Sequence, residues 1–448
     1  MSQVPVYFIP AGDYFGKTAE SCFLVFSPLK NKSFLVLPDE AKRLSKLLQE
    51  GESDDIIRQI LPAPEEIDKF AYHVEPEMTA AELLLNERCN FHCSYCYSAG
   101  NRSKAELTMA QIEPVIRFIH SCAVKHSQEK VSVTFIGGGE PLLSWDLIQK
   151  TAEFSQKLQE ADKIRTVWLL VTNGSLLTDE QLAFCKDHDI EIQFSFDILE
   201  RIQNFQRQSF SIVSANLKKA LKAGCRIYIR STITDANVDL LPEMAETCLR
   251  EYPTVDMIGC EPVTNEQMAK DPVYVKSFYD RYFASYREAC RVLENSAISI
   301  TSSSSRSIRQ LRKRFCGPML CLQAEGQILS CAHFSSPKSP DFEAFHYGCI
   351  KDGKVEFSLP DFYRIYPDSL PEECAKCWAR WNCGGGCNNQ RYMYKKEIFD
   401  IICEERKRML RYEILRSLGK QYFKTTGQDF IASIAGQLTA GQPEKNHE

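Results

Sequence analysis

Residues 83–97 read Leu-Leu-Leu-Asn-Glu-Arg-Cys-Asn-Phe-His-Cys-Ser-Tyr-Cys-Tyr, a short apolar run followed by three closely spaced cysteines, Cys89, Cys93 and Cys96. Three thiolates with C-x3-C-x2-C spacing can hold three irons of a four-iron cluster. Clusters that only transfer electrons normally take four cysteines, so this loop predicts an iron that is open to a substrate or cofactor. The alternative is a set of incidental cysteines or part of a zinc site, although zinc sites usually complete four ligands from paired spacings.

This spacing, with the aromatic Tyr95 before the last cysteine, resembles the signature of the radical S-adenosylmethionine (SAM) enzymes. In that family the amino and carboxylate groups of SAM chelate the open iron, and an electron from the reduced cluster breaks the sulfonium bond to give a deoxyadenosyl radical. The resemblance implies that Cys89, Cys93 and Cys96 are metal ligands and catalytic residues, that Tyr95 belongs to the cofactor site, and that SAM is a cofactor.

The composition is that of an ordinary globular protein, with 448 residues of which 44% are hydrophobic and 25% charged. The length suggests about three domains. A net charge of −5 gives no reason to expect nucleic acid as a partner. The N-terminus lacks a basic segment followed by an apolar core, and no apolar run approaches the ~20 residues that span a bilayer. We therefore expect a cytoplasmic protein without a membrane partner.

The chain contains nineteen cysteines. An odd count in a long chain without an export signal favours metal binding or catalysis over disulfides. Seven cysteines stand alone in apolar surroundings, and we expect them to be buried small hydrophobic residues. They are Cys22, Cys122, Cys185, Cys225, Cys248, Cys260 and Cys290. The sequence predicts an oxygen-sensitive metalloprotein.

From Glu82 onward, strand-like runs alternate with amphipathic helical patterns six times. The expected strands are Leu83–Asn86, Ser132–Ile136, Val167–Val171, Glu191–Phe196, Arg226–Thr232 and Asp256–Glu261. We expect helices to start at Thr108, at Ser144 and at Thr178, where Gln181 completes a capping box. Gly224 is expected to end the helix that begins near Ser209. Repeated βα units imply a parallel sheet, and six of them predict an α/β fold with a partial (β/α)6 TIM-like barrel.

Chemistry in such barrels lies at the carboxyl ends of the strands, and the unusual residues fall there. Gly138-Gly139-Glu140-Pro141 follows the second strand and matches the family's GGEP motif, whose backbone and carboxylate receive the SAM amino group. Glycines let a ligand approach the backbone, although a tight turn alone could also explain them. The resemblance implies that Gly138, Gly139, Glu140 and Pro141 bind the cofactor.

Three further residues at strand ends belong to the expected cofactor site. Ser195 matches the family serine that contacts SAM, and Arg230 resembles the arginine near the SAM carboxylate. For Arg230 the alternative is a salt bridge in the barrel mouth. Asn173 is expected to shape the pocket. The family often has Asp-Gly after the fourth strand, whereas this chain has Asp197-Ile198. The resemblance therefore does not imply that this loop contacts SAM.

The C-terminal third contains a second group of closely spaced cysteines, from Cys316 to Cys403. Their spacing resembles that of the SPASM extension of radical SAM enzymes. That extension holds two auxiliary four-iron clusters, so the resemblance implies three [4Fe-4S] clusters in all. The first auxiliary cluster would take Cys316, Cys321, Cys331 and Cys387, and the second Cys374, Cys377, Cys383 and Cys403. Because the two sets interleave, metal binding and folding should be coupled.

Three alternatives remain open in this region. In the first, only one of Cys316 and Cys321 is a ligand, which leaves an open site on the first auxiliary cluster. Cys349 is extra, and is either a spare thiol or an alternative ligand. Cys374, Cys377, Cys383 and Cys387 could instead form a zinc ribbon.

Residues 1–78 differ from the barrel region. Short β-like runs at Val4–Ile9, Ser21–Phe26 and Ser33–Leu37 precede a helix that starts near Asp39 and ends at Gly51, and a second helix at Asp54–Leu61. This α+β pattern resembles the peptide-recognition module of many maturases of ribosomally made peptides, in which a leader peptide adds a strand to the sheet edge. The alternative is a cap packed on the catalytic domain.

We therefore expect a recognition module over 1–78, a radical SAM barrel over 79–300, a SPASM domain over 301–404, and a C-terminal helix with a polar tail over 405–448. The resemblance implies a maturase that forms a thioether or carbon–carbon crosslink in a precursor peptide, with a flavodoxin or ferredoxin as reductant. A sulfatase-maturating enzyme or another SPASM dehydrogenase is a second candidate. Sulfatase-maturating enzymes have a proton-accepting aspartate where this chain has Ala332, followed by His333 as a possible base. A non-catalytic iron–sulfur or zinc protein is the candidate of another class.

Overall fold

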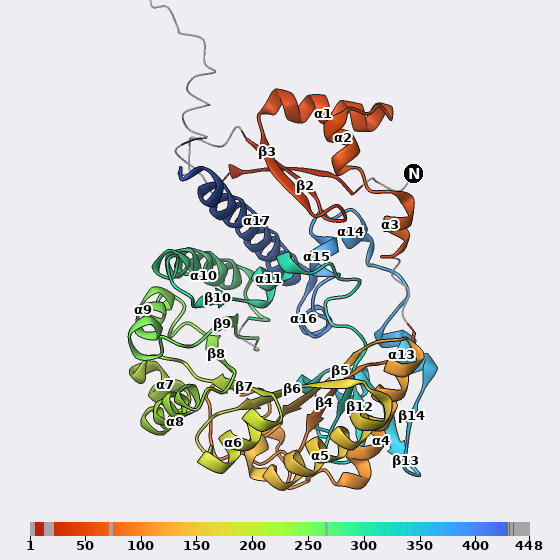
Figure 1. The fold of residues 1–448 in the computed structure, drawn as a ribbon, viewed down its shortest axis with the longest axis vertical. Coiled ribbons are helices and arrows are strands. Elements are labelled where there is room, and N and C mark those ends of the chain that lie inside the picture. Colours follow the sequence, from red (N-terminus) through yellow and green to blue (C-terminus); the bar gives the residue numbers. More distant parts are fainter. Residues whose placement is uncertain are drawn as a thin grey trace, which may run out of the picture.

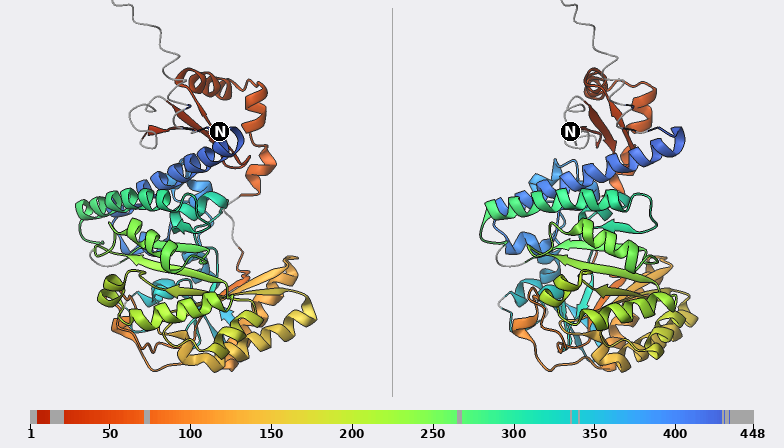
Figure 2. Two further views of the ribbon diagram at one scale, coloured as in Figure 1. Left: turned by 60° about the vertical axis from the view of Figure 1, so that its left-hand side comes forward. Right: turned by 90° about the vertical axis from the view of Figure 1, so that its left-hand side faces the viewer.

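The computed structural model describes residues 5–12, 22–70, 75–264, 268–334, 336–339, 341–428, 430 and 433. A three-stranded antiparallel sheet and an eleven-stranded sheet organise them. Figure 1 shows the small sheet at one end of the molecule and the large sheet at the other, with the long helix α17 (Lys396–Thr426) between them. The two further views in Figure 2 show the same arrangement.

Six neighbouring parallel strands form the centre of the large sheet. They are β4 (Ala80–Leu84), β5 (Lys130–Ile136), β6 (Arg165–Thr172), β7 (Ile190–Ser195), β8 (Ile227–Ile233) and β9 (Met257–Pro262). This confirms the α/β fold class, and five strands lie within two residues of their predicted ends. The prediction for the first strand was wrong, because β4 begins three residues earlier. Its first residues, Ala80-Ala81-Glu82, lack the apolar pattern that marks a strand in the sequence.

Helices connect the six strands and bury their apolar faces. They are α4 (Met109–Lys125), α5 (Trp145–Asp162), α6 (Asp179–Asp187), α7 (Glu200–Gln206), α8 (Phe210–Lys222), α9 (Leu241–Glu251) and α10 (Pro272–Val292). The predicted helix starts at Thr108, Ser144 and Thr178 are confirmed as N-caps, and Gly224 follows α8 with φ of +75°. All seven isolated cysteines are buried, as predicted.

The large sheet continues beyond β4 into the cysteine-rich segment. Strand β11 (Leu320–Leu322) pairs in parallel with β4, and β12 (Gln327–Leu329), β13 (His346–Lys351) and β14 (Lys354–Phe357) follow in antiparallel order. At the opposite edge, β10 (Ser299–Thr301) pairs in parallel with β9. The sequence did not predict this extension, which bonds the cysteine-rich segment directly to the first barrel strand.

Short helices complete the C-terminal region. They are α11 (Ser303–Arg306), α12 (Phe342–Phe345), α13 (Leu359–Ile365), α14 (Glu372–Ala375), α15 (Arg380–Cys383) and α16 (Asn388–Met393), with 3₁₀ turns at Ser307–Arg309 and Ala332–Phe334. Two further 3₁₀ turns, Ala99–Asn101 and Pro141–Ser144, lie in the loops after β4 and β5. The expected boundary after residue 404 falls inside α17, and the expected polar tail at 441–448 lies outside the described residues. Among the described residues, no helix has both the length and the apolar character needed to cross a membrane.

The N-terminal part has the predicted order of three strands and then helices. It consists of β1 (Tyr7–Pro10), β2 (Phe23–Ser27), β3 (Lys32–Val36), α1 (Pro38–Glu50), α2 (Asp55–Ile60) and α3 (Pro64–Asp68). The predicted strand starts at Val4 and Ser21 lie outside the described residues, and α3 was not predicted. Val25 packs with α1 and α2, whereas Leu24 and Phe26 pack with Leu410 and Ile414 of α17. The small sheet is therefore covered on both faces.

Candidate active site

The three-cysteine loop follows β4 at the carboxyl end of the parallel strands. Cys89, Cys93 and Cys96 are partly buried, and the backbone N–H of Cys96 donates to the carbonyl of Cys93 at 3.1 Å. Burial, with a smaller contribution from the charge of Cys96, raises the pKa of the Cys89 and Cys93 thiols. Binding iron requires thiolates, so metal binding at this loop would release protons.

Tyr95 fixes this loop to the neighbouring part of the barrel. Its hydroxyl donates to the buried carboxylate of Asp197 at 3.0 Å and accepts a hydrogen bond from Nη1 of Arg207 at 2.7 Å. The Arg207 guanidinium also lies 5.7 Å from the centre of the Tyr95 ring, and its charge opposes the burial-raised pKa of Cys93. Sequence reasoning missed Arg207, because nothing in its local sequence connects it with a loop more than 100 residues away.

A second arginine contacts the loop directly and was also missed. Nη2 of Arg102 lies 3.3 Å from Sγ of Cys96, and Nη1 donates to the carbonyl of Phe91 at 3.2 Å. The buried Nε atoms of Arg102 and Arg207 have no hydrogen-bond partner among the described residues. Two buried cationic donors without acceptors therefore flank the cysteine loop.

The GGEP loop lies against the start of the cysteine loop. The N–H groups of Gly139 and Glu140 donate to the carbonyls of Asn86 and Arg88 at 3.1 and 2.7 Å. A Cβ atom on Gly139 would lie 1.9 Å from the Arg88 carbonyl oxygen, so only glycine fits there. The carbonyl of Gly138 accepts a hydrogen bond from the Ser98 hydroxyl at 2.5 Å.

Glu140 is buried, and the chain itself satisfies its carboxylate. Oε1 accepts from the Thr172 hydroxyl at 2.6 Å and from the N–H of Leu142 at 3.1 Å, and Oε2 accepts from the N–H of Asn173 at 2.8 Å. Burial raises the pKa of Glu140, and these hydrogen bonds oppose that shift. The carboxylate joins the loops after β5 and β6. The side chain of Asn173 extends this link by donating to Asn90 of the cysteine loop at 2.9 Å.

Departures from the expected site occur after β7. Ser195 and Arg230 are paired in register on β7 and β8, and Arg230 lines a separate cavity of about 190 Å³ that also contacts Cys387. Ile198 replaces the glycine that the family often has and adopts φ of +66° while fully buried. A β-branched residue rarely takes this conformation, so packing must hold it there.

A cavity at the cysteine loop has a volume of about 770 Å³. Its walls come from the cysteine loop, the loops after β5, β8 and β9, and the cysteine-rich segment. Among the lining residues are Cys96, Tyr97, Gly138, Thr234, His333 and Phe334. The rings of Tyr97 and His333 stack with their centres 4.5 Å apart, and burial lowers the pKa of His333 to about 4, so the imidazole is neutral at physiological pH.

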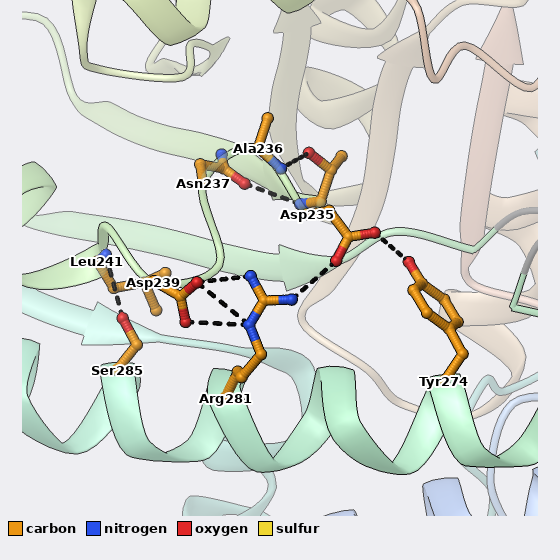
Figure 3. Close-up of polar contacts among 9 residues, drawn as sticks. Asp235, Ala236, Asn237, Asp239, Leu241, Tyr274, Arg281 and Ser285 are labelled. Carbon is orange, nitrogen blue, oxygen red and sulfur yellow. Dashed lines mark hydrogen bonds and ion pairs between the residues drawn. The ribbon is translucent and has the colours of Figure 1, made fainter.

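The wall that follows β8 is anchored from behind by α10, as Figure 3 shows. Arg281 reaches between two carboxylates, with Nη1 donating to Asp235 at 3.0 Å and Nη2 to Asp239 at 2.5 Å. The Tyr274 hydroxyl donates to the other oxygen of Asp235. Both Asp235 and Tyr274 line the cavity, so these contacts hold its rim in a fixed position.

Several cysteines expected in the first auxiliary set influence one another's pKa. Cys316 is exposed to solvent. The many protein atoms around its thiol nevertheless raise its pKa to about 12, and the neighbouring Cys387 adds to this increase. Burial and the charges of Cys387 and Cys316 likewise raise the pKa of Cys331. Cys321 on β11 is fully buried, and burial together with nearby Glu82 and Cys331 raises its pKa.

The second auxiliary set is grouped separately. Burial raises the pKa of Cys403 to about 11, with further contributions from Cys383 and Cys374. Burial raises the pKa of Cys377, and the nearby Cys383 adds to this increase. Cys349 lies on β13 opposite Gln327 and Glu356. Across the described residues, no three His, Cys, Asp or Glu side chains come close enough to hold a single metal ion.

Residues 83–248 match the radical SAM superfamily. These residues form a radical SAM domain. The match spans β4 to most of α9 and contains the three-cysteine loop, the GGEP loop, Ser195 and Arg230.

Two relatives extend the comparison along the chain. The radical SAM cyclopropyl synthase TigE of Paramaledivibacter caminithermalis is 24% identical over 158 residues, which cover 32% of this chain and 32% of TigE. The serine-type anaerobic sulfatase-maturating enzyme of Klebsiella aerogenes is 22% identical over 322 residues, which cover 67% of this chain and 76% of that enzyme. The chain thus spans about a third of TigE and about three quarters of the Klebsiella enzyme.

Solved structures share the fold over most of the chain. The structure of anSMEcpe with bound AdoMet has a TM-score of 0.59 at 16% identity and covers 80% of this chain and 100% of that one. SuiB of Streptococcus suis bound to S-adenosylmethionine has a TM-score of 0.51 at 13% identity, with coverage of 89% and 99%. At these identities the likeness establishes the fold alone.

The radical SAM domain implies SAM and a [4Fe-4S] cluster, and the residues of the loop fit a cluster. The loop holds three partly buried cysteines, and the orphaned Nε atoms of Arg102 and Arg207 are donors that the sulfurs of a cluster could accept from. Gly138, beside the close backbone contact at Gly139, lies on the cavity wall. Cys89, Cys93 and Cys96 would hold the irons, and Gly138 would face the SAM moiety.

Proposed function

We propose that this protein is a radical SAM peptide maturase that cleaves SAM reductively and modifies a ribosomally synthesised precursor peptide. The observation that carries the proposal is the cavity of about 770 Å³, which Cys96 and Gly138 of the radical SAM domain share with His333 and Phe334 of the cysteine-rich segment. In this proposal SAM and its cluster supply a deoxyadenosyl radical that takes a hydrogen atom from an unactivated carbon of the peptide. A thioether or carbon–carbon crosslink would then form with loss of a proton to solvent, and an auxiliary cluster would accept the remaining electron.

Within this proposal the chain's residues have distinct roles. The Glu140 carboxylate already accepts three hydrogen bonds from the protein, so we assign it to holding the loops and assign the backbone at Gly138 to the cofactor. Ser195 and Arg230 lie side by side on β7 and β8, and both are proposed to contact SAM although Arg230 lines the separate cavity of about 190 Å³. The two auxiliary clusters are proposed to use the two grouped cysteine sets.

The N-terminal module is proposed to bind the leader of the precursor peptide. Strand β3 is an edge strand, paired only with β2 among the described residues, and edge strands accept added strands. Both faces of the small sheet are already covered, which leaves an edge as the natural site. SuiB has also been solved bound to its precursor peptide SuiA, and that structure shares the fold with a TM-score of 0.50.

A sulfatase-maturating activity is a second candidate, because the Klebsiella relative aligns over 67% of this chain. Ala332, which replaces the aspartate of those enzymes, is buried and its methyl group cannot accept a proton. This favours the peptide maturase. A sulfatase-derived peptide containing serine or cysteine, supplied as substrate, distinguishes the two candidates.

The test of the proposed function is reductive SAM cleavage by the reconstituted full-length protein under anaerobic conditions. We expect 5′-deoxyadenosine from the wild type and none from the Cys89→Ala, Cys93→Ala, Cys96→Ala triple variant, while Cys225→Ala, outside the loop, retains the activity. A wild-type protein that binds iron but makes no deoxyadenosine would instead be a non-catalytic iron–sulfur protein. Modification of a short peptide encoded beside the gene then tests the maturase assignment.

The remaining partners follow from the same proposal. The clusters require an electron donor, and we propose a flavodoxin or ferredoxin. We also propose a cytoplasmic location, where reducing conditions protect clustered thiolates.

A further inference from the structure

Arg102 makes two contacts that span the three-cysteine loop. Its Nη1 donates to the carbonyl of Phe91, between the first and second cysteines, and its Nη2 lies 3.3 Å from Sγ of Cys96, the third. A planar guanidinium can make both contacts at once, which the single ammonium of lysine cannot do with the same geometry. Arg102 therefore clamps the two ends of the loop.

The charge of Arg102 is not neutralised by a carboxylate. No acidic side chain lies within ion-pair distance of it in the described part of the chain, and its buried Nε has no acceptor there. The residue also lines the large cavity. A full positive charge with an unused donor therefore lies beside the Cys96 thiol, and this charge also opposes the rise that burial causes in the pKa of Cys89.

An arginine beside the second auxiliary set of cysteines differs from Arg102 in its ion pairing. Nη2 of Arg391 lies 3.5 Å from Sγ of Cys374 and donates to the carbonyl of Gly385 at 2.8 Å. Its Nη1, however, is paired with Glu373 at 2.7 Å. Arg391 resembles Arg102 in its contact with sulfur, but the nearby carboxylate offsets its charge.

We propose that Arg102 is a positioning residue that raises the reduction potential of the cluster bound by Cys89, Cys93 and Cys96. Reduction adds negative charge to a cluster, and a nearby cation or an N–H···S hydrogen bond stabilises that charge. Arg102 provides both at Cys96. The inference rests on the proposed function only in requiring that the loop binds a cluster.

The test is a redox titration of the reconstituted full-length protein, followed by electron paramagnetic resonance (EPR). The SAM-responsive signal identifies the cluster of the loop. We expect Arg102→Met to lower its midpoint potential by at least 59 mV, a tenfold change in the ratio of reduced to oxidised cluster for a one-electron couple. Arg102→Gln, which keeps a donor without charge, should shift it in the same direction by less. Arg102→Lys, which keeps the charge, should remain closest to the wild type.

Arg391→Met is the matched control and should leave the SAM-responsive signal at its wild-type potential. An unchanged potential in both Arg102→Met and Arg102→Gln would overturn the proposal, as would an equal shift in Arg391→Met. If iron analysis shows that Arg102→Met has lost the cluster, the midpoint potentials of Arg102→Gln and Arg102→Lys test the proposal in its place. Loss of the cluster from all three would assign Arg102 to cluster assembly and reject the potential-setting role. A wild-type protein without any SAM-responsive signal would instead refute the proposed function.

Discussion

The Tyr95 hydroxyl lies 3.0 Å from Oδ2 of Asp197 and thereby joins the cysteine loop to the end of the fourth barrel strand. Asp197 is fully buried, and it also accepts hydrogen bonds from Gln206 and Ser231. On the other side, the same hydroxyl accepts from Arg207. One phenol thus lies between a buried carboxylate and a buried guanidinium, so the aromatic residue before the last cysteine has a structural role in this chain.

Tyr95→Phe should destabilise the protein by about 1–3 kcal/mol, because it leaves a buried donor of Arg207 and an acceptor of Asp197 without their partner. Chemical denaturation of the anaerobic protein measures the change, and iron analysis should show lower cluster occupancy. Tyr97→Phe is the control, since the Tyr97 hydroxyl has no hydrogen-bond partner within the described residues. Equal stability of the two variants would contradict the assigned role.

Gly139→Ala should cost about 1–3 kcal/mol, the usual range for overpacking, because the new Cβ would lie 1.9 Å from the Arg88 carbonyl. Separation of the GGEP loop from the cysteine loop should also abolish most SAM cleavage. Gly100→Ala, where the added carbon would meet no atom within 4 Å, should retain stability and activity. Thermal denaturation and deoxyadenosine formation together check both variants.

These contacts indicate what the sequence could and could not predict. Five barrel strands, the helix ends at Thr178 and Gly224 and the burial of the isolated cysteines depend on local patterns, and all were predicted. Arg102 and Arg207 were not, because their importance arises only when the chain brings them beside Cys96 and Tyr95. The pairing of β11 with β4 also escaped prediction, since a three-residue strand after some 240 residues leaves no periodic signal.

Trp381→Phe should loosen the N-terminal module. The indole Nε1 donates to the Tyr7 hydroxyl at 2.9 Å, and loss of this bond should cost about 1 kcal/mol. Tyr7→Phe should have a similar effect, and the double variant should be less destabilised than the sum of the two, because both remove one bond. Full additivity in denaturation experiments would show that the contact contributes nothing. Limited proteolysis should show faster cleavage between the module and the barrel.

His333→Ala should weaken peptide modification while sparing peptide-independent SAM cleavage. The imidazole stacks on Tyr97 in the cavity wall, so its removal should reshape the wall that the peptide is proposed to contact and raise KM for the peptide. His188→Ala, which removes a histidine that stacks on Phe184 outside the cavity, should leave KM unchanged. An equal fall in both SAM cleavage and peptide modification for His333→Ala would place the residue in the cofactor site instead.

The central claim is that Cys89, Cys93 and Cys96 leave one iron of a cluster free to bind SAM. Electron–nuclear double resonance on the reduced full-length protein, with SAM labelled by ¹⁷O in its carboxylate, tests this claim directly. The account predicts a hyperfine coupling between the label and the cluster that is absent from the Cys89→Ala, Cys93→Ala, Cys96→Ala variant. A reduced wild-type cluster that shows no coupling to saturating labelled SAM would contradict it.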